Sequence, residues 1–135
     1  MKLKKFKSFS LGRSAELYKA VSDEARIRIL AIIYTFGEIC VSDLEMILDF
    51  TQTKTSRHIT YLKNVQLISH KRIEKWIYYE LKEEYRDFVS QLIDNLDKDD
   101  LIKQDFENYK TMYGNSTLSV RLLHNKQRKY NLPEL

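Results

Sequence analysis

The chain has 135 residues, of which 43% are apolar and 12% aromatic, and this content is too high for a globally disordered protein. The length suits one domain with a single core. No run of 18 apolar residues occurs, so the sequence predicts no membrane-spanning segment. The single cysteine, Cys40, excludes an internal disulfide. With only three glycines and one proline, the composition favours helices over a turn-rich β fold.

The formal net charge is +4, but the charges are segregated along the chain. Residues 1–13 carry five cations and no acid, and residues 51–82 carry seven cations against two acids. Residues 83–107 are the reverse, with three cations against nine acids. A basic block of this size provides the attraction that a phosphate backbone needs. The basic N-terminus lacks the apolar stretch of a secretory signal, so we expect a cytoplasmic protein.

Residues 1–13 are predicted to form a basic arm, and two helices follow. The first helix begins near Ser14, and its apolar face holds Leu17, Tyr18 and Val21. The second begins with Ser22 as N-cap and ends at Gly37, which tolerates a left-handed backbone. Apolar residues occupy almost its whole circumference, so we expect it at the centre of the fold. They are Ile27, Ile29, Leu30, Ile32, Ile33 and Phe36.

A short extended link, residues 38–41, leads to a third predicted helix. Ser42 and Glu45 have the spacing of a capping box, in which each side chain satisfies the other's backbone N–H. The helix runs to about Asp49 and buries Leu44, Ile47 and Leu48. A tight turn at residues 50–52 then leads to a fourth helix.

The fourth helix, Thr51 to Asn64, is the stretch around which the chain is organised. Thr51 or Thr53 can serve as its N-cap. A buried stripe is predicted at the spacing i, i+4, i+7, formed by Thr55, Ile59 and Leu62. Two short helices joined by a few residues, the second of them basic, form a helix-turn-helix.

The remaining faces of the fourth helix carry hydrogen-bonding side chains and cations but no carboxylate. A solvated helix face normally mixes both charge signs, so this one favours contact with a nucleic acid. Arg57 can reach a guanine edge with two hydrogen bonds, whereas Lys54 better suits a phosphate. The candidate DNA contacts in this helix are Gln52, Thr53, Lys54, Ser56, Arg57 and His58. His58 adjoins the buried stripe, so we expect it to be half packed and only partly available.

A β-hairpin is predicted after the fourth helix. Residues 68–73 and 76–81 are rich in β-branched and aromatic residues, and Glu74 and Lys75 lie between them. A basic hairpin directly after a helix-turn-helix is a wing. Its candidate contacts to phosphates or the minor groove are Lys71, Arg72 and Lys75.

Two further helices are predicted towards the C-terminus. Residues 85–96 show the strongest helical periodicity of the chain, and residues 101–113 follow after an acidic turn. We therefore divide the chain after the N-terminal arm into a winged-helix DNA-binding and dimerisation domain over residues 14–96 and a C-terminal helix and tail over residues 97–135. The two helices carry more apolar surface than one small core needs, and such surface typically marks an interface. The tail from residue 114 onward is compatible with a short helix or an extended arm.

These elements resemble the ArsR/SmtB family of winged-helix bacterial repressors. The matching segments follow one another in the family's order and span about half of the chain: residues 17–23, 26–30, 38–44, 55–59 with Leu62, and 76–81. The resemblance implies a homodimer, built by the first and the C-terminal helices. It also implies binding to double-stranded operator DNA and release when an inducer binds.

The two metal-sensing sites of the family are not evident in this sequence. Arsenite-sensing members carry Cys-x-Cys at the start of the third helix, where this chain has Cys40 and Ser42. A dimer would supply two thiolates, too few for a thiolate-rich site. We therefore interpret Cys40 as a small buried residue and Ser42 as a helix cap. The zinc-sensing pattern of the C-terminal helices falls on Glu83, Tyr85, Leu96 and Asp99, without either histidine.

The three histidines, His58, His70 and His124, fall in three different predicted elements. We predict no metal and no cofactor, and the inducer remains open. The sequence shows no glycine-rich phosphate loop and no nucleophile beside a base, so it gives no support for an enzyme.

The sequence therefore predicts a mainly α fold with a small hairpin, acting as a homodimeric winged-helix transcriptional repressor. The alternative is a winged helix that binds proteins, since fold alone does not determine function.

Overall fold

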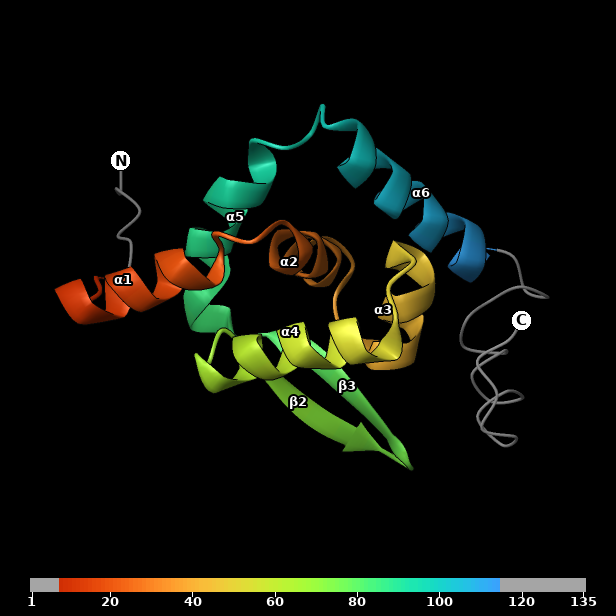
Figure 1. Ribbon diagram of the computed structural model, residues 1–135, viewed down its shortest axis with the longest axis horizontal. Helices are drawn as coiled ribbons and strands as arrows, with labels where there is room; N and C mark the ends of the chain where they lie inside the picture. Colours follow the sequence, from red (N-terminus) through yellow and green to blue (C-terminus); the bar gives the residue numbers. More distant parts are fainter. Residues whose placement is uncertain (1–7, 115–135) are drawn as a thin grey trace, which may run out of the picture.

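The computed structural model describes residues 8–114, which fold into six α-helices, one 3₁₀ helix and three strands (Figure 1). The order along the chain is α1 (Leu11–Ala20), α2 (Glu24–Phe36), β1 (Ile39–Cys40), α3 (Val41–Leu48), α4 (Gln52–Asn64), β2 (Ile68–Ile73), β3 (Trp76–Leu81), η1 (Glu83–Tyr85), α5 (Arg86–Asp94) and α6 (Asp100–Gly114). The predicted mainly α fold with a helix-turn-helix and a hairpin is confirmed. The expectations for residues 1–7 and 115–135 lie outside the described residues.

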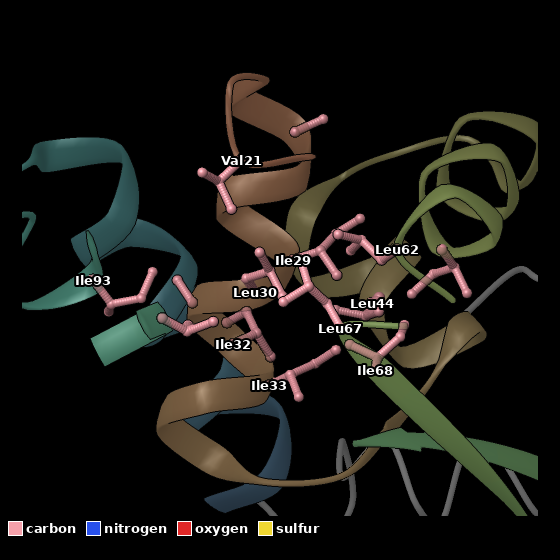
Figure 2. Packing of buried hydrophobic residues seen from close by; sticks show 14 of the residues in the cluster. Val21, Ile29, Leu30, Ile32, Ile33, Leu44, Leu62, Leu67, Ile68 and Ile93 are labelled. Atoms are coloured by element: carbon pink, nitrogen blue, oxygen red, sulfur yellow. The ribbon is translucent and has the colours of Figure 1, made fainter. Parts of the chain in front are cut away.

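Helix α2 is the centre of the fold, as its apolar circumference predicted. Ile29, Leu30 and Ile32 are fully buried, and the other helices and the sheet surround them (Figures 1 and 2). Each such side chain contributes about 1.5–3 kcal/mol through its burial. Gly37 ends the helix with φ of +97°, a conformation that side chains rarely adopt.

Three predicted helix starts differ from the observed ones. Helix α1 begins at Leu11, because the hydroxyl of Ser10 accepts a hydrogen bond from the Arg13 N–H at 3.0 Å. The N-cap of α2 is Asp23 and not Ser22. Helix α3 already begins at Val41, so Ser42 lies inside it and the predicted capping box does not form.

The sheet has one more strand than predicted. The predicted hairpin forms in register, with Ile68 opposite Leu81 and Ile73 opposite Trp76. The link before α3 adds the short strand β1, which pairs with β3 and gives the antiparallel order β1-β3-β2. This pairing fixes Cys40 at the end of a strand, and α3 starts at the next residue. The early start of α3 follows from it.

Helices α5 and α6 run from their connection along two sides of α2 (Figure 1). The prediction of spare apolar surface on residues 101–113 is wrong for the face that contacts the core. The Phe36 ring stacks on Tyr109 with centroids 3.9 Å apart and meets Phe106 edge-on at 5.2 Å. Helix α6 thus packs on α2 and α3 within one chain. Among the described residues, every helix is too short or too polar to cross a membrane.

Candidate nucleic-acid interface

Helix α4 is held in place by its N-cap and its buried stripe. The Thr51 hydroxyl accepts a hydrogen bond from the Lys54 N–H at 3.1 Å, which confirms Thr51 as the N-cap. Thr55, Ile59 and Leu62 are 0–2% exposed, as predicted. The Thr55 hydroxyl donates to the Thr51 carbonyl at 2.8 Å, so this polar side chain is satisfied inside the core.

The opposite side of α4 forms a continuous polar surface. Its exposed residues recur at helical spacing and include two cations and no acid: Gln52, Thr53, Ser56, Arg57, Thr60, Lys63 and Asn64. We call these seven residues the α4 face. Four of the predicted contacts, Gln52, Thr53, Ser56 and Arg57, lie in it. An exposed helix face of donors without carboxylates can approach a polyanion without charge repulsion.

The prediction of His58 as a contact is revised, because its side chain lies behind the α4 face. His58 is only 6% exposed, and its Nδ1 is 3.5 Å from Nη1 of Arg26. Burial lowers the pKa of His58, and the nearby cations of Arg57 and Arg26 act in the same direction against the opposing effect of Asp23. The side chain therefore favours the neutral form and acts in packing.

Lys54 lies at the edge of the α4 face and is partly buried. Its Nζ is 4.2 Å from the centroid of the Phe50 ring, a cation–π contact that orients the side chain. Arg26 lies behind the helix, with its guanidinium 4.1 Å from the Tyr61 ring and a hydrogen bond of 2.6 Å to the Ala20 carbonyl. Of these two cations, only Lys54 lies beside the α4 face.

The wing consists of β2, β3 and the turn between them, where Glu74 has φ of +58°. Lys71, Arg72 and Lys75 all have exposed side chains near its tip. Lys71 forms an ion pair with Glu38 at 2.6 Å, and this hydrogen bond raises the pKa of Lys71. The carboxylate thus neutralises one of the three predicted wing contacts, whereas Arg72 and Lys75 extend beyond it.

Sequence reasoning missed Arg13, which connects α1 to the end of α4. Its guanidinium donates to the Val65 carbonyl at 2.6 Å and to the Tyr85 hydroxyl at 2.7 and 3.0 Å. Val65 is the C-cap of α4, so α1, α4 and the start of α5 meet at one cation. A cation near a helix C-terminus also interacts favourably with the helix dipole. The sequence offered no signal for this contact, because Arg13 fell in the predicted arm.

Two buried acids that sequence reasoning also missed fasten α6 to the supporting helices. Asp105 is 1% exposed and binds Arg28 of α2, and Asp43 of α3, also 1% exposed, accepts a hydrogen bond from the Tyr113 hydroxyl. Burial raises the pKa of Tyr113, and the Asp43 carboxylate raises it further. A signal was present, since Asp105 shares the apolar stripe of Ile102 and Tyr109.

The positions of the family's sensor sites have structural roles. Cys40 is 3% exposed, in agreement with its interpretation as a small buried residue. The Asp99 carboxylate caps α6 by accepting hydrogen bonds of 3.0 Å from the Leu101 and Ile102 N–H groups. Within residues 8–114, no three His, Cys, Asp or Glu side chains lie close enough together to hold a metal ion.

Known proteins resemble this chain in sequence and in fold, although no profile of a protein family matches it. The arsenic resistance transcriptional regulator ArsR2 of Pseudomonas putida is 33% identical over 78 residues, which cover 58% of this chain and 68% of that protein. The arsenical resistance operon repressor of Escherichia coli is 34% identical over 79 residues, with the same two coverages.

Among solved structures, the winged helix-turn-helix domain Mb0332 of Mycobacterium bovis superposes with a TM-score of 0.57 at 22% identity. The superposition covers 64% of this chain and 82% of that one. It shows the shared fold, and the sequence matches show the family. The chain belongs to the ArsR family of transcriptional repressors.

Proposed function

We propose that the protein is a repressor that binds double-stranded operator DNA through the α4 face and the wing. The observation that carries this proposal is the α4 face itself, which holds seven exposed polar residues and no carboxylate on a helix fixed from behind. A helix presented in this way fits the major groove. The relatives, which are transcriptional regulators, do not favour the alternative of a protein-binding module.

The proposed contacts divide by chemistry. Arg57 reads a base edge, and Gln52, Thr53 and Ser56 add hydrogen bonds near the helix N-terminus. Lys54 contacts a phosphate from the edge of the face, and Arg72 and Lys75 hold the flanking backbone. Lys71 contributes less, because Glu38 is bound to it at 2.6 Å. His58 is left out of the contact set, because it is 6% exposed.

We further propose a homodimer formed by α1 and α5. Helix α1 meets α5 (Figure 1), where the Tyr18 and Phe88 rings lie 5.2 Å apart, and α1 carries apolar side chains that one chain leaves uncovered. Leu11 is 89% exposed and Tyr18 is 63% exposed. The domain Mb0332 is described as homodimeric. A two-fold axis would place two copies of α4 about one DNA turn apart, which suits an inverted repeat.

The dimer is tested by the mass of the protein in sedimentation equilibrium, where a monomer has 16.2 kDa. The wild type is expected at twice this mass. Leu11→Glu is expected to shift it towards the monomer, because a charge would be buried in the interface. Leu101→Glu is the matched control, since Leu101 is an exposed leucine (45%) on α6. Dissociation by the control alone would place the interface elsewhere.

DNA binding is tested by selection from a randomised duplex library, followed by titration of the selected duplex and a random duplex at several salt concentrations. We expect enrichment of an inverted repeat, and affinity for both duplexes that falls steeply with salt. Absence of an enriched sequence together with no binding to random duplex would overturn the proposal. The protein would act in the cytoplasm, where chromosomal DNA is found, and an inducer would release it.

A further inference from the structure

A hollow of about 610 Å³ lies between α2, α5 and α6, and none of its lining residues belongs to α4. It forms because α5 and α6 both pack on α2 and diverge from their connection (Figure 1). Its volume is within the range of small-molecule sites, about 300–1,000 Å³. None of the residues named above for the α4 face or for the proposed dimer interface lines it.

Five of the nine residues that line the hollow are apolar or aromatic. Ile93, Leu96 and Ile102 supply aliphatic surface, and Tyr34 and Phe106 supply rings. Ile93 and Ile102 are 6% and 5% exposed, so they are fixed parts of the core. The hollow therefore offers a rigid apolar surface to a ligand of similar character.

The charges around the hollow favour a cation. Asp94 ends α5 and Asp97 lies in the turn after it, and both are exposed. Neither carboxylate forms an ion pair within the described part of the chain. The C-terminus of α5 adds the negative end of the helix dipole at the same place.

Arg86 is the one cation among the lining residues, and it is already engaged. Its guanidinium lies 4.8 Å from the centroid of the Tyr34 ring and donates to the Tyr34 carbonyl at 3.4 Å. Arg86 begins α5 and Asp94 ends it, so the two charges lie at opposite ends of the helix. A bound cation would place its charge at the acidic end and its apolar body on Ile93 and Phe106.

Helix α6 connects the hollow to the DNA-binding elements. Ile102 and Phe106 line the hollow, while Asp105 of the same helix binds Arg28. One turn further, Asn108 Nδ2 donates to the Ile47 carbonyl of α3 at 3.0 Å. Because α3 packs against α4, a shift of α6 would reach the recognition helix through α3.

We propose that this hollow binds a small amphipathic organic cation and that its occupancy weakens DNA binding by moving α6. The coupling to DNA rests on the proposed repressor function, whereas binding of the cation does not.

The experiment uses three probes of one shape and different charge: 4-phenylbutylammonium, 4-phenylbutanol and 4-phenylbutyrate. Binding to the full chain is measured by calorimetry and by NMR shifts at Ile93 and Ile102. We expect the ammonium probe to bind at least about fivefold more tightly than the neutral probe, and the carboxylate probe least tightly. Equal binding of the three probes, or no saturable binding of the ammonium probe at millimolar concentrations, would overturn the proposal.

Variants locate the site without entering the core. Asp94→Asn with Asp97→Asn is expected to remove the preference for the ammonium probe, and Arg86→Gln is expected to strengthen it. Asp100→Asn is the matched control, because Asp100 is an exposed carboxylate at the start of α6 that does not line the hollow. An equal loss of preference in the control would contradict the site.

The coupling is measured by titrating random duplex with and without saturating ammonium probe. DNA affinity is expected to fall about fivefold or more in the wild type and to stay unchanged in the Asp94→Asn, Asp97→Asn variant. Unchanged affinity in the wild type would overturn the coupling. Failure of the probe-free protein to bind any duplex would instead contradict the repressor function, so the two failures are distinguishable.

Discussion

Arg28 of α2 holds the buried carboxylate of Asp105 of α6 with two hydrogen bonds of 2.8 Å each, from Nε and Nη2. The same Nη2 donates to the Leu48 carbonyl at 3.2 Å, and the guanidinium lies 4.9 Å from the centroid of the Phe50 ring. The hydrogen bonds with Asp105 raise the pKa of Arg28. One arginine thus joins α6 to the end of α3 and to the turn that precedes α4.

Replacing Asp105 with asparagine is expected to lower the free energy of unfolding by about 2–3 kcal/mol, because Arg28 would keep its charge without a carboxylate partner. The measurement is urea denaturation followed by circular dichroism. Glu107→Gln is the control, since Glu107 pairs with Lys110 at 4.0 Å and both side chains are more than half exposed. Its expected effect is below about 0.5 kcal/mol. Equal effects of the two substitutions would show that the buried pair does not fasten α6.

The central and peripheral parts of the fold differ in how far sequence predicts them. The stripe of Thr55, Ile59 and Leu62 and the apolar circumference of α2 are local periodicities, so they could be predicted. The start of α3 depends on the pairing of Cys40 with Tyr78, a contact between residues far apart in the sequence. A local capping pattern at Ser42 carries no information about that pairing.

The candidate interface shows the same division. Helical spacing places Gln52, Ser56 and Arg57 on one side of α4, and the structure agrees. His58 adjoins the stripe of Thr55, Ile59 and Leu62, which indicates partial packing, and the packing against α2 makes it 6% exposed. The partner of Lys71 is Glu38, which lies in the link before β1, and that proximity arises only when β1 joins the sheet.

Arg13 and Tyr85 provide a test of the link between α1 and α4. Arg13→Met and Tyr85→Phe each remove hydrogen bonds of 2.7–3.0 Å between the guanidinium and the phenol. A double-mutant cycle in urea is expected to give a coupling energy of about 1 kcal/mol, the size of a partly buried, charge-assisted hydrogen bond. Strictly additive effects would mean that the two side chains do not stabilise one another.

The buried His58 predicts a pH dependence of stability. Its pKa is lowered in the folded protein, so the unfolded chain binds more protons below the ordinary histidine pKa of about 6.5. Stability is therefore expected to fall as the pH decreases from about 7.5 to 5.5. His58→Gln should show a smaller decrease over the same range, measured as the free energy of unfolding. His70 is present in both proteins, so its contribution cancels. Parallel pH profiles would contradict the burial of a neutral His58.

The wing is expected to act on any DNA sequence. Lys75→Ala should weaken binding to selected and random duplexes equally, and should reduce the slope of log affinity against log salt by about 1. Lys71→Ala is the comparison within the same wing, and its effect should be smaller because Glu38 already neutralises Lys71. A larger effect at Lys71 than at Lys75 would indicate that the ion pair opens when DNA binds.

The central claim, that α4 reads bases in operator DNA, is tested most directly by Arg57→Ala. The measurement is the ratio of affinities for the selected duplex and a scrambled duplex, by fluorescence anisotropy at one salt concentration. Loss of a bidentate contact costs about 1–3 kcal/mol of discrimination, so the ratio should fall about tenfold. Lys103→Ala, which removes an exposed cation of α6, should leave the ratio unchanged. A ratio that is the same for Arg57→Ala and the wild type would contradict base reading by this residue.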